Sequence, residues 1–144
     1  MSRVSSYIKT NTPTQMYREK LGHEVWVDLH AMVHFGVPLG PLMESVKRSY
    51  PCQSCRKHLL HHLAHDVPPM GKNEEQWLVD VHNTVNLDLG KPTKSYDYCA
   101  TYDRYEERVR RLRSLPSYDA RLQELHRAFQ KLTMPSIKRR TLHA

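Results

Sequence analysis

Apolar side chains recur at steps of three and four residues along most of this chain, which is the pattern of amphipathic helices. The first such segment spans residues 16–35, and Gly36 and Pro38 follow it as stop signals. Its apolar positions are Leu21, Val25, Trp26, Leu29, Met32 and Val33. No segment of appreciable length alternates apolar and polar residues with a period of two, so no β-sheet is expected. The pattern therefore predicts an all-α fold.

Three further helices are predicted in the middle of the chain. The second covers residues 41–48, and the third runs from Pro51, a residue suited to a first helical turn, to about residue 65. The fourth starts at a capping box formed by Asn73 and Gln76. Its apolar stripe and stop signals are Trp77, Leu78, Val81, Val85 and Leu89, followed by Gly90 and Pro92. Four helices thus form the predicted core.

Two more helical segments, residues 102–115 and 118–132, lie in the part of the chain that carries the formal net charge of +7. Residues 1–103 contain 11 Lys and Arg against 11 Asp and Glu, whereas residues 104–144 contain 11 against 4. Apolar positions at helical spacing indicate amphipathic helices that dock on the bundle or on a partner. A solvated basic face and a contact with nucleic acid or an acidic protein are the alternatives.

Length and composition indicate one compact domain with an appendage. A chain of 144 residues can bury one hydrophobic core but is too short for two full domains. No stretch approaches the roughly 18 apolar residues of a membrane span, and the N-terminus lacks the apolar stretch of a secretory signal. We therefore expect a soluble, intracellular protein. Three cysteines are too few for a disulfide-rich secreted scaffold, so redox or metal chemistry is the better interpretation of them.

Cys52 and Cys55 form a CxxC pair at the start of the third predicted helix. The helix dipole stabilises a thiolate at that position, which favours redox chemistry. Zinc sites use the same spacing, and the histidines that follow are His58, His61, His62 and His65. These ligands would lie along one straight helix and would not all converge on a metal ion, so a zinc site is the less favoured alternative. The pair alone permits both chemistries.

A polar face on the fourth predicted helix carries the second chemical signal. His82 and Asn86 are four residues apart and share a face, with Asn83 beside them. This face borders the apolar stripe, so one imidazole and two amides need hydrogen-bond partners close to the core. A planar polar ligand would provide such partners.

Three motifs of the chain match a known family in order and spacing. They are Leu21-Gly22-x-x-x-Trp26-x-x-x-His30, Tyr50-Pro51-Cys52-x-x-Cys55 and Trp77-Leu78-x-x-x-His82-Asn83-x-Val85-Asn86-x-x-Leu89-Gly90-Lys91-Pro92. Over residues 16–105 the chain therefore resembles the Erv/ALR family of FAD-linked sulfhydryl oxidases. The resemblance implies a four-helix bundle with a short fifth helix that binds FAD, usually in a homodimer. The expected domains are a flexible N-terminus at 1–15, the FAD-binding bundle at 16–105 and a basic, helical C-terminal extension at 106–144.

The resemblance also implies which residues act. Cys52 and Cys55 are the expected catalytic pair, and no metal ligand is expected. The expected FAD contacts are Arg18, Gly22, Trp26, His30, Tyr50, His82, Asn83, Val85, Asn86, Lys91, Arg104 and Tyr105. A substrate thiolate would attack the disulfide at Cys52, and electrons would pass from Cys55 to the flavin and then to O₂, which gives hydrogen peroxide.

The implied partners are a thiol-containing protein or a thioredoxin-like redox protein, with O₂ as the electron acceptor. A short form with a single CxxC pair resembles viral members of the family. The expected location of such a form is the cytoplasm or the virion, rather than the mitochondrial intermembrane space.

The chain departs from the family pattern at positions that concern the cofactor and the third cysteine. The arginine that the family has after Gly22 is His23 here, which weakens an expected contact to the cofactor's phosphates. The family commonly places a cysteine after Trp77-Leu78, but this chain has Val79, which leaves Cys99 without an evident partner. Cys99 is interpreted as an inert thiol, with intermolecular disulfide exchange as the alternative.

Overall fold

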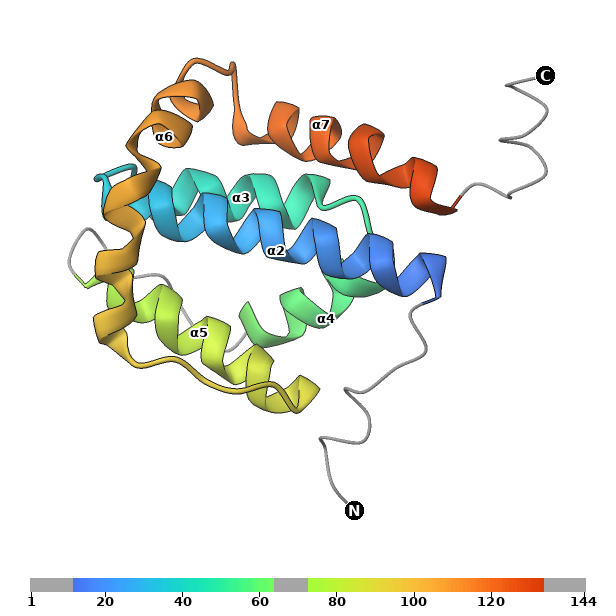
Figure 1. Cartoon of the computed structure of the whole chain (residues 1–144), viewed down its shortest axis with the longest axis horizontal. Coiled ribbons are helices and arrows are strands. Elements are labelled where there is room, and N and C mark those ends of the chain that lie inside the picture. Colours follow the sequence, from blue (N-terminus) through green and yellow to red (C-terminus); the bar gives the residue numbers. More distant parts are fainter. Residues whose placement is uncertain (1–11, 64–72, 134–144) are drawn as a thin grey trace.

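The computed structural model describes residues 12–63 and 73–133, and every regular element in these ranges is a helix (Figure 1). The α-helices are α2 (Pro13–His34), α3 (Leu39–Ser49), α4 (Gln53–Leu63), α5 (Glu74–Leu89), α6 (Glu106–Arg113) and α7 (Tyr118–Gln130). Two 3₁₀ segments, η1 (Tyr96–Tyr105) and η2 (Lys131–Thr133), complete the set. The predicted all-α fold is confirmed.

Helix α2 lies at the centre of the molecule. Figure 1 shows α3 and α7 on one side of α2 and α4 and α5 on the other, while η1 and α6 cross one end of these helices. Because neighbours surround it, α2 is buried on nearly all faces between Val25 and Val33. Thr12 caps α2, since its hydroxyl accepts a hydrogen bond from the Gln15 N–H at 3.2 Å. Gly36, at a φ of +89°, follows its end as predicted.

The described residues of the C-terminal segment dock on the bundle. Side chains of α6 and α7 belong to the same core as those of α2 and α3: Val109, Leu112, Tyr118, Leu122 and Leu125. Of the arrangements considered for this segment, docking on the bundle is therefore the one that the structure shows. The hydrophobic core continues across the expected domain boundary between residues 105 and 106. The boundary itself stays a prediction.

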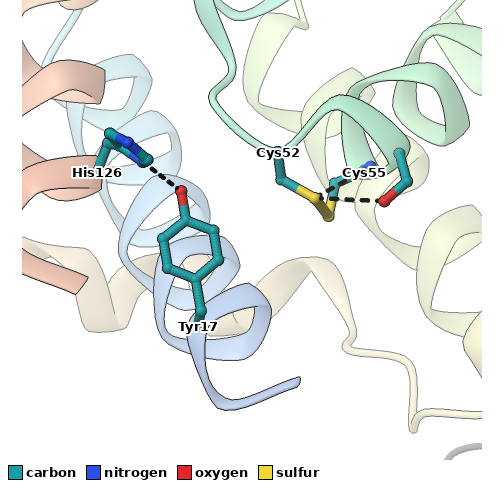
Figure 2. Close-up of a disulfide and its surroundings, with 5 residues drawn as sticks. Tyr17, Cys52, Cys55 and His126 are labelled. Atoms are coloured by element: carbon teal, nitrogen blue, oxygen red, sulfur yellow. Dashed lines mark hydrogen bonds between the residues drawn. A yellow bond between two sulfur atoms is a disulfide. The ribbon is translucent and has the colours of Figure 1, made fainter. Parts of the chain in front are cut away.

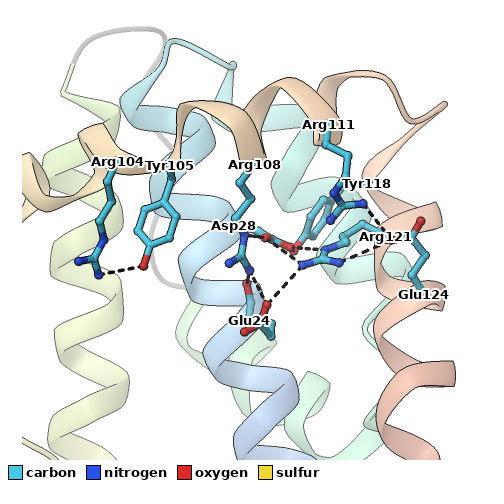
Figure 3. A network of polar contacts seen from close by, with 9 residues as sticks. All are labelled: Glu24, Asp28, Arg104, Tyr105, Arg108, Arg111, Tyr118, Arg121 and Glu124. Atoms are coloured by element: carbon cyan, nitrogen blue, oxygen red, sulfur yellow. Dashed lines mark hydrogen bonds and ion pairs between the residues drawn. The ribbon is translucent and has the colours of Figure 1, made fainter.

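A buried ionic network attaches α6 and α7 to α2 (Figure 3). Asp28 of α2 is 0% exposed and accepts hydrogen bonds from Arg108 Nε at 2.8 Å, Tyr118 Oη at 2.9 Å and Arg121 Nε at 2.8 Å. Glu24, one helical turn earlier, accepts from both arginines as well. Every charge in the network is paired and hydrogen-bonded, and these interactions offset the free-energy cost of removing the charges from water.

Local details differ from the sequence-based expectation at three helix starts. Asn73 precedes α5 in a left-handed conformation at a φ of 60° and forms no side-chain cap, while the Gln76 amide binds Asp80; the predicted capping box is therefore wrong. The carboxylate of Glu74 accepts the Leu39 N–H at 3.0 Å, so it serves the start of α3. Helix α4 begins at Gln53, two residues after Pro51.

Two further helix boundaries can be compared with the prediction: the start of the helix expected from residue 102 and the end of α4. The helix expected from residue 102 is a 3₁₀ helix until Tyr105 and becomes α-helical only at Glu106. The expected end of α4 near residue 65 lies outside the described residues. None of the helices in the described ranges combines the length and the apolar character that crossing a membrane requires.

Candidate active site

The CxxC pair lies at the start of α4 and is joined as a disulfide (Figure 2). The two Cα atoms are 5.2 Å apart. Cys52 immediately precedes the helix, and its sulfur accepts the Cys55 N–H at 3.2 Å, as the side chain of a helix cap does. The main-chain carbonyl of Cys52 accepts the Arg56 N–H at 2.8 Å, which closes the first turn. Both sulfurs therefore lie at the N-terminus of a helix, where the helix dipole favours negative charge.

The structure provides no ligand set for the zinc alternative within the residues that it describes. The two sulfurs are bonded to each other, whereas zinc is bound by free thiolates. No group of three or more His, Cys, Asp or Glu side chains in these ranges could hold a metal ion. This finding does not test three of the histidines considered, because His65 and the side chains of His58 and His62 lie outside what the structure describes.

A cavity of about 810 Å³ extends from the disulfide into the bundle. Its size is within the range of pockets that bind cofactors and other small molecules. Cys55 lines it, whereas Cys52 does not. Eight of the expected cofactor contacts line it too: Arg18, Gly22, Trp26, Tyr50, His82, Val85, Asn86 and Lys91. Apolar side chains from α2 and α5 form much of the remaining wall, including Val25, Leu29, Leu78 and Val81.

The rings of Trp26 and His82 stack in the wall of this cavity. Their centroids are 3.8 Å apart and their planes differ by 5°. Trp26 comes from α2 and His82 from α5, so the pair joins the two helices that contribute most of the lining. Burial, followed by Lys91 and Lys94, lowers the pKa of His82 to about 4. The imidazole is therefore neutral near pH 7.

His30 lies behind this pair and is fully buried. Its Nε2 is 3.0 Å from His82 Nδ1 and 3.1 Å from Tyr98 Oη. Burial, and then the neighbouring His82, lower the pKa of His30 to about 3, so this imidazole is neutral as well. Its Nδ1 has no hydrogen-bond partner among the described residues, which is unusual for a buried polar atom. His30 thus reaches the cavity through His82 and not directly.

Two tyrosines of η1 belong to the site although sequence reasoning missed them. Tyr98 and Tyr102 both line the cavity, and the Tyr102 hydroxyl donates to Tyr98 Oη at 3.4 Å. The ring of Tyr102 also stacks on His30, with the centroids 5.3 Å apart. The density of tyrosines between residues 96 and 105 was the only sequence signal for them. Their partner His30 is about 70 residues away in the chain.

Asn83 shapes the cavity without lining it. Its amide donates to the Lys94 carbonyl at 2.7 Å, and its oxygen accepts the Lys94 N–H at 2.9 Å. The Asn83 side chain thereby holds the segment that follows α5, from which Lys91, Pro92 and Lys94 line the cavity. Gly90 lets the chain turn into this segment, because it ends α5 in the left-handed conformation at a φ of 75°.

Arg104 and Tyr105 lie apart from the cavity. The Arg104 guanidinium donates to Tyr105 Oη at 3.0 Å and lies 5.0 Å from the centroid of its ring. Tyr105 also faces Arg108, at 5.7 Å from its ring centroid. The expected contact of Arg104 and Tyr105 with the cofactor stays a prediction, which the lining of this cavity does not support.

Cys99 is a buried free thiol in η1. Burial, and then the carboxylate of Glu75, raise its pKa to about 12. A thiol with so high a pKa is almost entirely protonated at neutral pH and is a poor nucleophile. These properties agree with the interpretation of Cys99 as an inert thiol.

The sequence matches one family model and several curated proteins. The model of the Erv1/Alr family matches residues 23–109. The "FAD-linked sulfhydryl oxidase ERV1" of Arabidopsis thaliana is 34% identical over 96 residues, which cover 58% of this chain and 50% of the relative. The protein of the same name from Oryza sativa subsp. japonica is 32% identical over 96 residues, covering 58% and 49%.

A viral relative matches as well. The "Probable FAD-linked sulfhydryl oxidase R368" of Acanthamoeba polyphaga mimivirus is 31% identical over 96 residues, which cover 56% of this chain and 66% of the relative. The chain spans about half the length of the plant relatives. No solved structure matches it significantly. The family match covers more than half of the chain, including the disulfide and most of the cavity wall, and the chain therefore belongs to the Erv1/Alr family.

Proposed function

We propose that this protein is an FAD-dependent sulfhydryl oxidase that forms disulfide bonds in thiol substrates. One observation carries the proposal: a single sulfur of the CxxC disulfide, that of Cys55, lines a cavity of about 810 Å³ whose wall contains the stacked rings of Trp26 and His82. This arrangement provides one sulfur for the cofactor and leaves the other for the substrate. The names of the relatives, all FAD-linked sulfhydryl oxidases, support the same activity.

The residues of the cavity fit FAD. The aromatic and apolar side chains of the wall, with Trp26 and His82 among them, suit a planar ring system. Arg18, Lys91 and Lys94 supply positive charge for phosphates, a role in which His23 replaces the family's arginine. The unpartnered Nδ1 of buried His30 leaves a polar atom that needs a partner beside the site. When bound, the flavin would supply the two-electron acceptor that no side chain of the protein can provide.

The steps carried by the protein's own residues involve only sulfur and protons. A substrate thiolate attacks Cys52, which forms a mixed disulfide and releases Cys55 as a thiolate. The N-terminus of α4 stabilises that thiolate. A second substrate thiol then attacks the mixed disulfide, so the substrate leaves with one new S–S bond and the pair is left with two electrons more. We propose further that O₂ is the final electron acceptor and that it is reduced to hydrogen peroxide.

The proposed partners follow from this activity. The substrate is a protein thiol or a thioredoxin-like redox partner, and the oxidase acts as a homodimer in the cytoplasm or the virion.

A nucleic-acid contact is less well supported, because the described arginines of α6 are engaged within the protein. Arg108 binds Asp28, Arg110 pairs with Glu106 and Glu107, Arg111 with Glu124, and Arg113 donates to the Phe35 carbonyl.

The test is the absorption spectrum and the oxygen consumption of purified protein supplied with a dithiol. Wild-type protein is expected to show flavin absorbance and turnover. The Cys55→Ser variant should keep the flavin but lose at least about 100-fold of its activity, since the electron path through the disulfide is broken. The Cys99→Ser variant is the matched control and should retain activity. Folded protein that binds no added FAD, or an active Cys55→Ser variant, would contradict the proposal.

A further inference from the structure

Helix α7 contacts the segment that leads into the redox-active disulfide, although it lies beyond the residues that the family model matches. The contact is made by Asp119 in the first turn of α7. Its carboxylate accepts a two-pronged hydrogen bond from Arg48, with Arg48 Nη2 at 2.7 Å and Arg48 Nε at 3.0 Å. It also accepts from the hydroxyls of Ser45, at 2.7 Å, and Ser49. We call this set, Asp119 with Ser45, Arg48 and Ser49, the Asp119 clamp.

The Asp119 clamp holds the last turn of α3, and the chain runs from this turn directly to the disulfide. Only Tyr50 and Pro51 separate Ser49 from Cys52. The main-chain carbonyl of Arg48 also accepts a hydrogen bond from Arg56 Nη1 at 3.2 Å, and Arg56 directly follows Cys55. The chain segments before and after the CxxC pair are therefore both attached to the turn of α3 that Asp119 holds.

A second contact from α7 reaches the same region. Tyr17 Oη is 2.7 Å from His126 Nδ1, and Figure 2 shows this contact in one view with the disulfide. Tyr17 and Tyr50 are buried in one core with Cys52. Burial, and then the nearby Tyr17, raise the pKa of Tyr50, so the two hydroxyls lie in one apolar region. Helix α7 is thus attached both to the last turn of α3 and to the helix, α2, whose Tyr17 shares a core with Cys52.

We propose that α7 is part of the redox centre and that Asp119 is a positioning residue that sets the reduction potential of the Cys52–Cys55 disulfide. The potential depends on how much the surroundings favour the dithiol, and especially its thiolate, over the disulfide. The Asp119 carboxylate neutralises Arg48 and holds the turn of α3 to which the segments before and after the CxxC pair are attached. Both effects favour the disulfide, so loss of the carboxylate should favour the reduced form.

The experiment measures the reduction potential in the full-length protein. Wild type and Asp119→Asn are equilibrated in glutathione buffers of graded composition, and the reduced fraction of Cys52 and Cys55 is determined by alkylation and mass analysis. We expect Asp119→Asn to raise the equilibrium constant for reduction by about 3- to 10-fold, where tenfold corresponds to about 30 mV for a two-electron couple. Asp119→Glu, which keeps the charge, should recover most of the wild-type value.

Glu24→Gln is the matched control. Glu24 also binds arginine from α7, but this ion pair attaches that helix to α2 and not to the last turn of α3. The variant should lower the free energy of unfolding without moving the potential. Ser49→Ala is a milder variant of the Asp119 clamp, because it removes one hydrogen bond to α3 without changing a charge. It should raise the equilibrium constant for reduction of the disulfide about twofold, in the same direction as Asp119→Asn.

The outcomes separate positioning from a merely structural role. A potential that stays at the wild-type value in folded Asp119→Asn would overturn the proposal, and so would an equal shift in Glu24→Gln. If Asp119→Asn fails to fold, an unshifted potential in Ser49→Ala overturns it as well. Because the readout is the disulfide itself, the result does not depend on whether the cavity binds FAD.

Discussion

His30 and His82 are two neutral imidazoles in contact with each other, and His82 lines the cavity. An unfolded chain would bind a proton at each of them near pH 6.5, whereas the folded protein resists protonation until the pH reaches about 4 at His82 and about 3 at His30. Between these values the unfolded state binds more protons. The free energy of unfolding must therefore decrease as the pH falls from about 6.5 to 4.

This linkage predicts a difference between wild type and His82→Phe, a variant that keeps an aromatic ring against Trp26. Each such histidine contributes a slope of up to about 1.4 kcal/mol per pH unit. The wild-type free energy of unfolding, measured by urea denaturation between pH 6.5 and 4.5, should fall more steeply than that of the variant by about 1 kcal/mol per pH unit. Equal slopes would show that His82 already binds a proton in the folded protein at these pH values.

Cys99 differs from the CxxC pair in a property that labelling can measure. With a pKa of about 12, its thiolate fraction near pH 8 is about one in ten thousand, and the thiol is buried. In reduced, folded protein we expect a maleimide to modify Cys52 and Cys55 at least about 100-fold faster than Cys99. The three rates should converge in 6 M urea. Fast labelling of Cys99 in the folded protein would instead support the alternative of disulfide exchange at this residue.

At the scale of the elements, α2 organises the molecule through two opposite faces. One face contributes Trp26 to the cavity, together with His30 behind it. The other carries Glu24 and Asp28, which bind the arginines of α6 and α7 (Figure 3). The ionic network therefore holds the C-terminal helices against the helix that forms the cavity wall.

The network predicts a large effect of Asp28→Asn. Removing the buried carboxylate takes from Arg108 and Arg121 their fully buried ionic partner and leaves them to share the more exposed Glu24, so we expect a loss of about 3–5 kcal/mol in the free energy of unfolding. Glu107→Gln is the control, because this side chain is 83% exposed and pairs with Arg110 on the surface. Its effect should stay below about 0.5 kcal/mol. Urea denaturation of both variants at pH 7 compares them, and similar losses would mean that the buried network adds nothing.

At the scale of the whole molecule, the helices enclose one cavity that reaches a disulfide and is bordered by basic side chains. A ligand that binds the folded state alone raises stability by mass action, by about 2.7 kcal/mol at 100 times its dissociation constant. We therefore expect FAD at that excess to raise the free energy of unfolding of flavin-free protein by about this amount. Thermal or urea unfolding with and without added FAD measures the difference.

Val85→Trp provides the matched control for this prediction. Val85 lines the cavity, and an indole at that position would occupy part of its volume. The variant is compared with its own flavin-free state, so that any loss of stability from the substitution itself cancels. We expect FAD to leave its stability unchanged. A full shift in Val85→Trp would place the flavin site elsewhere.

Much of the local structure could be predicted from the sequence. The three- and four-residue periodicity located the helices, because a buried helix face repeats at that spacing whatever its neighbours are. Gly36 and Gly90 marked helix ends correctly, since only a residue without a side chain adopts a positive φ at little cost. The motifs around Trp26, Cys52 and His82 were sufficient to indicate the family.

The long-range contacts that build and support the site could not be predicted in this way. The contact of Tyr98 with His30 and the contacts of Asp28 with Arg108 and Arg121 join residues 68 to 93 positions apart. A local pattern records which face of a helix is apolar but not which distant side chain faces it. The failed capping box at Asn73 has the same cause, because tertiary packing set the conformation of that turn.

The sequence by itself determined the helices, the CxxC pair at a helix start and the family, because all three depend on residues close together in the chain. Only the tertiary structure decided that Cys55 faces the cavity while Cys52 does not, that the basic C-terminal segment is part of the core, and that Asp119 holds the end of α3. These features arise from the packing of helices against one another, and packing is specified by shape and charge across contacts that no local spacing encodes.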